Sequence, residues 1–342
     1  MKLILIVLLN FIFIANTNSQ EDILKKKKAI TFFNLAVEKL KNKEYADALN
    51  QLNNAINSYE NFTEAYLERG KIRFHLEDYQ GAIQDINESI NKGINKGEAY
   101  FCRAFIYLKT DTSKVNIEDF NRAIELGYDN YYVYYYRGLI KLIRKNYKES
   151  IEDFTKALEK NSTYSFAYHN RGVAKMYLND FQGAIYDFRM ALSYNNKLSV
   201  SYINMGYCRI QSGDYQNAIE DYNQALKIDS SYIIYNNRGI AKFYAGDIDG
   251  ARKDFEKALT LNPENKIIRN NFSNVITKQG NYSEALKIFN KIIEQSFDFA
   301  EVYLNRGMLK ELTGDLKGAC DDWKKAKDLG LNIADDYLSE CK

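Results

Sequence analysis

Residues 165–198, SFAYHNRGVAKMYLNDFQGAIYDFRMALSYNNKL, contain a spacing of aromatic and small residues that predicts the fold. Tyr168 lies four residues before Gly172, and Ala184 lies twelve residues after it. Phe188 follows Ala184 by four residues. Because offsets of three and four bring side chains to one face of a helix, this stretch predicts two amphipathic helices.

The same spacing recurs along the chain. Small residues repeat at the register of Gly172, 34 residues apart except for one interval of 33: Ala36, Gly70, Ala104, Gly138, Gly172, Gly206, Gly239, Ser273 and Gly307. With positions numbered 1 to 34, nine repeats start at residues 29, 63, 97, 131, 165, 199, 232, 266 and 300. Breaks such as Ala245-Gly246-Asp247 separate helix A from helix B in each repeat. Glycine within a helix costs about 1 kcal/mol relative to alanine, so its recurrence indicates close packing of two backbones.

This pattern resembles the tetratricopeptide repeat family over residues 29 to 333. The resemblance implies an all-α fold, an α-α superhelix of helix-turn-helix repeats with helix A on the inner, concave surface. We expect nine repeats within residues 20–333 and a cap helix at residues 334–342, because terminal repeats of a solenoid need a cover. Two repeats are irregular. Repeat three has residues 110–114 as its turn, and repeat eight has Arg269, Ser273 and Ile292 at signature positions.

The first nineteen residues are typical of a signal peptide. Lys2 supplies the positive charge, and residues 3–15 are apolar except for one asparagine. Thirteen residues are too few to span about 30 Å of hydrocarbon comfortably, so we expect no stable membrane span after cleavage. Cleavage between Ser19 and Gln20 would leave a periplasmic or secreted protein. An uncleaved anchor and a buried first helix are the alternatives.

Charge and motifs favour no cofactor chemistry. The net charge is +2, which provides no electrostatic footprint for nucleic acid. The two histidines, His75 and His169, are far apart in sequence, and no metal-binding or phosphate-binding motif occurs. The carboxylates recur at repeat positions, which indicates a role in the scaffold. We therefore expect neither an enzyme nor a cofactor.

Two charged positions vary together from repeat to repeat. Position 7 is arginine and position 23 is aspartate in the same six repeats: Arg69 and Asp85, Arg103 and Asp119, Arg137 and Asp153, Arg171 and Asp187, Arg238 and Asp254, Arg306 and Asp322. Repeat eight has Phe272 and Ile288 at these positions, and repeat six has Met205 and Asp221. The pairing predicts structural contacts between the two helices of a repeat. An exposed pair of this kind contributes only about 0.2–1 kcal/mol.

Helix A carries apolar side chains on the side away from its packing stripe, at positions 2, 6, 9 and 13. In repeat four these are Tyr132, Tyr136, Leu139 and Ile143. A surface helix is expected to be polar on that side. Positions 2 and 9 could pack against the neighbouring repeat. The other interpretation is a groove with an aromatic floor, including Tyr136, Tyr177, Tyr207 and Tyr244, that binds a partner.

Position 6 is asparagine in six repeats, five of them consecutive: Asn34, Asn170, Asn204, Asn237, Asn271 and Asn305. An asparagine amide can both donate to and accept from an extended peptide backbone. This row resembles the asparagine ladder in the repeat domain of the protein-modifying N-acetylglucosamine transferase. The alternative is family habit, since many such repeats have Asn-Arg-Gly there.

Four cysteines are present. Cys102 and Cys208 are expected to be free, buried thiols. Cys320 occupies a position that is aliphatic in other repeats, so it could be a small core residue. A cap helix antiparallel to the last helix would bring Cys341 close to it, and the pair is then a possible disulfide in an oxidising compartment.

These features predict a non-enzymatic scaffold that binds an extended segment of a client protein or peptide in a concave groove. The predicted peptide-binding residues are Asn170, Asn204, Asn237, Asn271, Asn305, Tyr136, Tyr177, Tyr207 and Tyr244. The alternative is a structural subunit of a cell-envelope or secretion complex that binds folded partners.

Overall fold

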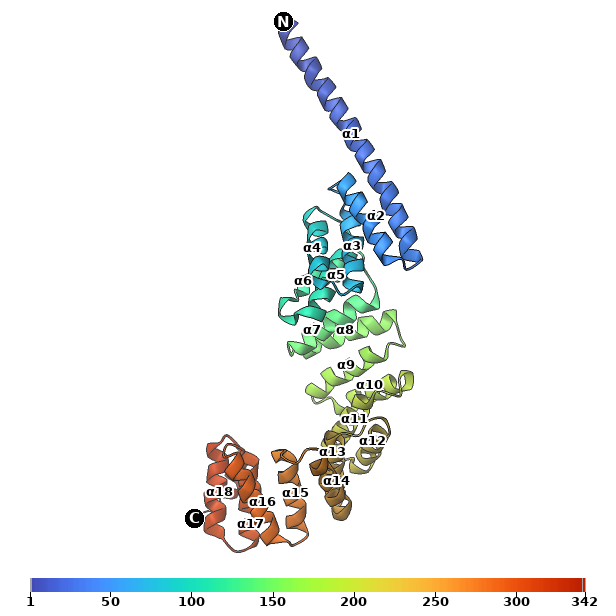
Figure 1. Cartoon of the computed structure of the whole chain (residues 1–342). Coiled ribbons are helices and arrows are strands. Elements are labelled where there is room, and N and C mark those ends of the chain that lie inside the picture. The colour runs from blue at the N-terminus through green and yellow to red at the C-terminus, as the bar shows by residue number, and fades with distance from the viewer. Residues whose placement is uncertain (1, 340, 342) are drawn as a thin grey trace. The chain divides into compact units, whose positions relative to one another are not determined.

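The structure, a computed structural model, describes residues 2–339 and 341, with side chains from residue 20 onwards. The described part consists of α-helices and one short 3-10 helix, connected by turns (Figure 1). It divides into two compact halves, residues 1–162 and residues 163–342. Each half is a series of antiparallel helix pairs, which confirms the predicted all-α architecture of helix-turn-helix repeats.

The N-terminal half contains repeats one to four. Its helices are α1 (Lys2–Lys41), α2 (Tyr45–Ser58), α3 (Thr63–His75), α4 (Tyr79–Asn91), α5 (Gly97–Thr110), η1 (Thr112–Lys114), α6 (Ile117–Glu125), α7 (Tyr131–Ile143) and α8 (Tyr147–Lys160). The irregular turn of repeat three forms the 3-10 helix η1.

The C-terminal half contains repeats five to nine. Its helices are α9 (Ser165–Tyr177), α10 (Phe181–Tyr194), α11 (Ser199–Gln211), α12 (Tyr215–Ile228), α13 (Tyr232–Tyr244), α14 (Ile248–Leu261), α15 (Lys266–Lys278), α16 (Tyr282–Gln295), α17 (Ala300–Leu312), α18 (Leu316–Asp328) and α19 (Ala334–Leu338). In repeats two to nine, helix A begins at the residue where the sequence pattern starts the repeat.

The small position of helix A allows a large ring of helix B to approach the backbone. A side chain at Gly206 of α11 would place its Cβ 2.7 Å from Cζ of Tyr222 on α12. A Cβ at Gly138 of α7 would lie 3.0 Å from Phe154 of α8. Both rings are completely buried or nearly so. This contact explains why glycine recurs within helices despite its low helix propensity.

Turn chemistry separates helix A from helix B. Gly246 ends the turn after α13 with a φ of +86°, a conformation that favours glycine. The next residue, Asp247, caps α14 by accepting a hydrogen bond of 2.9 Å from the backbone N–H of Gly250. Asp315 and Gly318 make the equivalent contact at the start of α18.

The predicted arginine–aspartate pairs are confirmed as contacts between the two helices of a repeat. Arg137 binds Asp153 through Nε and Nη2, at 2.9 and 2.6 Å. Its third donor, Nη1, reaches Asn121 on helix B of the preceding repeat at 2.7 Å. Lys141 adds an ion pair of 2.7 Å to Asp153, whose side chain is only 1% exposed. The aspartates of these pairs are buried, so the free energy given for an exposed pair does not apply to them.

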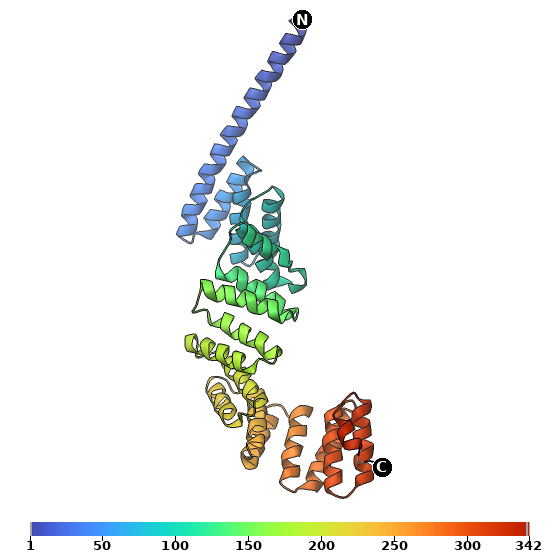
Figure 2. The ribbon, with the colours of Figure 1, turned by 180° about the vertical axis from the view of Figure 1, so that it is seen from behind.

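The N-terminal segment is one continuous helix. α1 extends past the end of α2, so the predicted signal sequence and helix A of repeat one share a helix (Figure 2). Residues 20–28 are exposed, and Ala29 is the first completely buried residue among those whose side chains are described. Within the described part of the chain, no helix combines the length and apolar character needed to cross a membrane.

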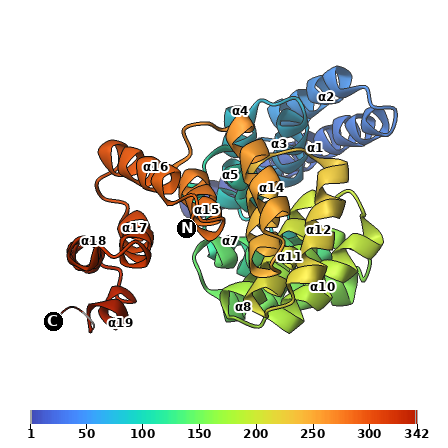
Figure 3. The same cartoon turned by 90° about the horizontal axis from the view of Figure 1, so that it is seen from below.

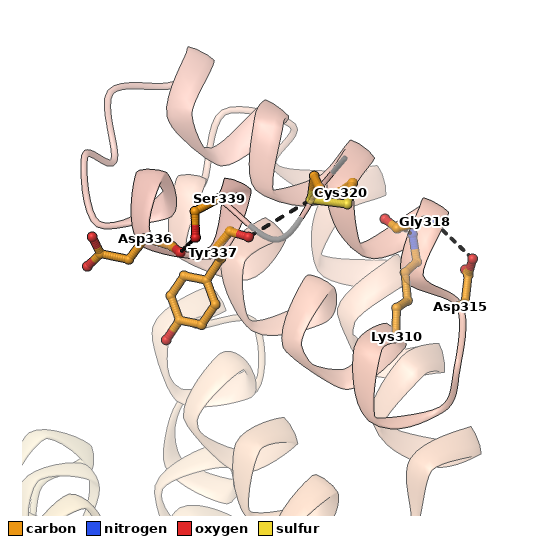
Figure 4. Close-up of a disulfide and its surroundings, with 8 residues drawn as sticks. Lys310, Asp315, Gly318, Cys320, Asp336, Tyr337 and Ser339 are labelled. Carbon is orange, nitrogen blue, oxygen red and sulfur yellow. Dashed lines mark hydrogen bonds between the residues drawn. A yellow bond between two sulfur atoms is a disulfide. The ribbon is translucent and has the colours of Figure 1, made fainter.

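The C-terminal cap is shorter than predicted. α19 spans only Ala334–Leu338 and packs against α18, as Figure 3 shows, with Ala334 buried. Residues 340 and 342 of the predicted cap lie outside the described residues. Cys341 forms a disulfide with Cys320 of α18, with the two Cα atoms 5.7 Å apart (Figure 4). The bridge therefore connects the cap to the last repeat.

The other two cysteines are free thiols. Cys208 is completely buried, whereas Cys102 is only half-buried. Burial raises the pKa of each thiol to about 12, which keeps both protonated and poorly reactive near neutral pH.

Candidate peptide-binding groove

The A helices of the C-terminal half are neighbours in series. α9 contacts α11, α11 contacts α13, α13 contacts α15, and α15 contacts α17. Position 6 of each of these five helices is one of the predicted asparagines. The A helices therefore carry these side chains in consecutive repeats of one compact half.

The two interpretations of the apolar side of helix A apply to different positions. Position 2 is exposed in repeats four to eight: Tyr132, Phe166, Val200, Ile233 and Ile267. Position 9 is half-buried in repeats four, five and seven: Leu139, Val173 and Ile240. Position 13 is exposed wherever it is apolar in these repeats, with Tyr177 58% and Tyr244 59% exposed. Position 9 is therefore partly covered in these three repeats, whereas positions 2 and 13 are available to a partner. Tyr207 and Met308, at position 9 of repeats six and nine, are exposed as well.

A groove of about 500 Å³ lies along α13, α15 and α17. Its lining combines the side chains of Tyr244, Asn305, Met308 and Leu312. A smaller cavity of about 140 Å³ lies next to α13 and α15 and is lined by Tyr244 and Asn271. Tyr244 and Asn274 line both spaces. Three predicted site residues, Tyr244, Asn271 and Asn305, therefore border this groove region.

The asparagines of the groove region are oriented by hydrogen bonds between repeats. Asn271 donates from Nδ2 to Oδ1 of Asn236, at position 5 of the preceding repeat, over 3.0 Å. Asn305 donates in the same way to Asn270 over 3.1 Å. Asn236 in turn donates from Nδ2 to Oδ1 of Asn237 over 3.1 Å. Asn271 and Asn305 each retain one N–H and the carbonyl oxygen for a ligand.

The remaining predicted asparagines occupy the same register outside these two cavities. Asn170, Asn204 and Asn237 are half-buried on α9, α11 and α13. Asn204 makes no side-chain hydrogen bond with any described residue. Beside Asn170, the ring of His169 lies 2.8 Å from Oγ of Ser201 on α11. Burial lowers the pKa of His169 to about 4, so the ring is neutral near physiological pH.

The predicted tyrosines differ in their surroundings. Tyr177, Tyr207 and Tyr244 are all exposed, and the ring of Tyr244 stacks on that of Tyr215 at 5.4 Å. Tyr136 belongs to the N-terminal half and is half-buried. Its ring lies 4.9 Å from that of Phe105. The structure therefore places Tyr136 in an aromatic cluster of α5 and α7.

Several lining residues were not predicted. Asn274, Lys278, Met308 and Leu312 occupy positions 9 and 13 of repeats eight and nine. The stripe at positions 2, 6, 9 and 13 of helix A includes these four residues and is the sequence signal that marks them. The orienting residues Asn236 and Asn270 had a weaker signal, the doublets Asn236-Asn237 and Asn270-Asn271.

Charged side chains contribute little to the lining of the groove. Lys278 is the only charged side chain in the lining of the larger groove. The other lining groups are amides, hydroxyls and apolar side chains. Among the described residues, no group of three or more His, Cys, Asp or Glu side chains could hold a metal ion. The arrangement is suited to hydrogen bonding with a neutral backbone and to contact with apolar side chains.

Comparison with known proteins supports the helical-repeat assignment. Sequence models of the tetratricopeptide repeat match residues 33–95, 199–232 and 242–309. No curated protein sequence matches the chain. Similar solved structures include a tetratricopeptide repeat protein from Parabacteroides merdae, with 19% identity, a TM-score of 0.59, and coverage of 71% of this chain and 97% of that one.

Two further solved structures have the same fold. The C-terminal part of a repeat-containing protein from Cytophaga hutchinsonii has 18% identity and a TM-score of 0.55, and the match covers 70% of this chain and 98% of that one. PilW, a widely conserved type IV pilus biogenesis factor, has 16% identity and a TM-score of 0.50, with coverage of 59% and 94%. At these identities the likeness concerns the fold alone.

Proposed function

This chain belongs to the tetratricopeptide repeat family, and we propose that it is a non-enzymatic scaffold that holds an extended segment of a client protein. The general role of a protein-interaction scaffold follows from the fold. The groove along α13, α15 and α17 is the binding site that we assign to the client.

One observation carries this proposal. Tyr244 borders both cavities of the groove region. It lines the smaller cavity together with Asn271 and the larger one together with Asn305. The amides are held by hydrogen bonds to the preceding repeat, and each keeps a free donor and a free acceptor. Such amides can pair with the N–H and C=O of an extended backbone, and the ring can contact an apolar side chain.

The chemistry of the lining also indicates what kind of client segment the groove can bind. An extended backbone can form hydrogen bonds with the asparagine amides of the groove whatever its side-chain sequence. The apolar side chains at positions 9 and 13, such as Met308 and Leu312, favour apolar side chains in the client. The proposed client is therefore an unfolded or extended segment with few charges.

A direct test uses a fluorescein-labelled 15-residue peptide of alternating Leu, Ser, Phe and Thr. The control peptide has the same sequence with N-methylated backbone amides, which removes the N–H groups and keeps the side chains. We expect fluorescence anisotropy to detect saturable binding of the first peptide and at least tenfold weaker binding of the second. Equal binding of both peptides would contradict backbone recognition.

A second test removes the amides. Each lost hydrogen bond costs on the order of 1 kcal/mol, so the triple variant Asn271→Ala, Asn274→Ala, Asn305→Ala, which removes the three asparagine amides that line the groove region, is expected to bind about a hundredfold more weakly. The matched control changes three exposed helix-B residues, Gln216, Thr260 and Ser283, to alanine. Circular dichroism checks that helicity is retained in both. If the triple variant binds normally while a folded partner co-purifies with the wild type, the protein is instead an assembly subunit.

We also propose that the protein is exported and begins at Gln20 in its mature form. The exposure of residues 20–28 supports this, because removal of the preceding residues would uncover no buried side chain there. N-terminal sequencing of the protein from its native cell tests the proposal. Recovery of intact Met1 from the cytoplasmic fraction would contradict it.

A further inference from the structure

Repeat eight lacks the buried ionic network that the other repeats of the C-terminal half contain in whole or in part. In repeat nine, Arg306 and Lys310 both bind Asp322, at 2.6 and 2.8 Å. The equivalent residues of repeat eight are Phe272, Ile276 and Ile288. All three polar partners are thus replaced together by apolar side chains.

The replacement coincides with an open pocket of about 300 Å³. It is lined by Leu259 of α14, by Arg269 and Phe272 of α15, and by Lys287, Ile288 and Lys291 of α16. Leu259, Phe272 and Ile288 are half-buried and form its apolar floor. A pocket of this size and composition is in the range that accepts a ligand group.

The cations of this pocket are not equivalent. Arg269 uses its donors within the protein, on Pro263 O, Gln295 Oε1 and Glu264 Oε1, at 2.8, 2.6 and 2.7 Å. Lys287 and Lys291 are exposed and form no ion pair with any described residue. They lie one helical turn apart on α16, a spacing at which like charges repel. No carboxylate lines the pocket, so two unpaired positive charges border an apolar floor.

The pocket and the peptide-binding groove lie on opposite sides of α15. The groove uses position 6 and position 9 of this helix, Asn271 and Asn274. The pocket uses position 4 and position 7, Arg269 and Phe272. At 100° per residue these pairs point in nearly opposite directions, so a ligand in one does not occupy the other.

We propose that this pocket binds an acidic linear segment of a partner protein. One large apolar side chain of the segment packs on Phe272 and Ile288. Flanking carboxylates pair with Lys287 and Lys291 and relieve their mutual repulsion. The site is independent of the groove, so the two predict separate partners.

The test uses the full chain and a fluorescein-labelled peptide with the sequence Gly-Ser-Asp-Glu-Leu-Phe-Glu-Asp-Ser-Gly. We expect saturable binding by anisotropy that weakens at least tenfold in the variant Lys287→Glu, Lys291→Glu. The matched control is Lys253→Glu, Lys257→Glu, which reverses two exposed lysines at the same spacing on α14 and is expected to bind normally. Equal loss in both variants would show a non-specific charge effect and overturn the proposal.

A second variant introduces into repeat eight the arginine, lysine and aspartate that repeat nine has at the same positions. Phe272→Arg, Ile276→Lys, Ile288→Asp restores the residues of repeat nine, so it is expected to fold, with binding of the acidic peptide reduced at least tenfold. The groove variant Asn271→Ala, Asn305→Ala is expected to keep acidic-peptide binding. Unchanged affinity in the restored variant would overturn the proposal. If dodecanoate displaced the labelled acidic peptide as effectively as the unlabelled peptide does, the pocket would be assigned to a fatty carboxylate and the peptide assignment would be overturned.

Discussion

The side-chain amide of Asn305 on α17 donates a hydrogen bond to the side-chain oxygen of Asn270 on α15, 3.1 Å away. Asn270 is only 5% exposed, so this bond satisfies an oxygen that has little access to water. Position 6 therefore has two roles in repeats eight and nine. It connects one repeat to the next, and it faces the groove.

This double role predicts unequal effects on stability. Asn305→Ala leaves the buried oxygen of Asn270 without its partner, which costs about 1–3 kcal/mol of unfolding free energy. Asn204→Ala is the matched control, because Asn204 has no side-chain hydrogen bond within the described residues and its loss is expected to be nearly neutral. Urea unfolding of the two variants measures the difference. Equal destabilisation would contradict the structural role of Asn305.

The buried ion network predicts that partial removal is worse than complete replacement. Asp153→Ala leaves Arg137 and Lys141 unpaired and is expected to cost about 3 kcal/mol or more. The variant Arg137→Phe, Lys141→Ile, Asp153→Ile copies the residues of repeat eight and is expected to cost less, because no unpaired charge remains. Thermal unfolding compares them. A larger loss of stability in the triple variant than in Asp153→Ala would contradict the prediction.

The hydroxyl of Tyr222 predicts a stabilising substitution. The ring is completely buried, and the hydroxyl has no hydrogen-bond partner among the described residues. Tyr222→Phe removes a polar group that is buried at a cost, so we expect a gain of about 1 kcal/mol. Phe255→Tyr makes the reverse change at the equivalent position of repeat seven and is expected to destabilise. Denaturant midpoints report both, and a loss of stability in Tyr222→Phe would contradict the assignment.

Asp221 predicts an unusual dependence of stability on pH. Repeat six has Met205 at position 7, so Asp221 is paired with Arg209 at 2.6 Å and its Oδ2 has no hydrogen bond. Burial raises its pKa from 3.8 to about 7, despite the opposing effect of Arg209 and Arg189. Between pH 4 and 7 the native carboxyl keeps a proton that the unfolded chain has lost. Its contribution to stability therefore falls as pH rises through this window, by up to about 1.4 kcal/mol per pH unit.

The difference in unfolding free energy between the wild type and Asp221→Asn isolates this effect. It is expected to fall steadily from pH 4 to pH 7 and then to level off. His169 titrates in an overlapping range with the opposite sign, but it is present in both proteins and cancels. A difference that stays constant with pH would contradict the prediction.

The disulfide predicts a stability that depends on redox conditions. The bridge closes a loop between residues that are 21 positions apart, so its loss is expected to cost about 3 kcal/mol. Thermal unfolding with and without dithiothreitol measures this in the wild type. Cys320→Ser is expected to unfold at the same temperature in both conditions. An unchanged wild-type transition under reduction would show that the bridge contributes little.

The repeats, the start of each repeat and the pairing of position 7 with position 23 could all be predicted from the sequence. These features are local, since helix periodicity and the turn of one repeat place Arg137 and Asp153 on facing helices. The sequence also marked repeat eight as irregular. It could not show that Phe272 and Ile288 border an open pocket, because Leu259 reaches the pocket from the preceding repeat.

The contacts between repeats could not be predicted from the sequence and are known only from the three-dimensional structure. The bond from Asn305 to Asn270 and the burial of Asp153 depend on how closely successive helices approach. That distance is set by the rings and glycines of both repeats together, and no spacing within one repeat encodes it. The same limit applies to Cys320 and Cys341. Their Cα atoms are 5.7 Å apart only because α19 folds back onto α18.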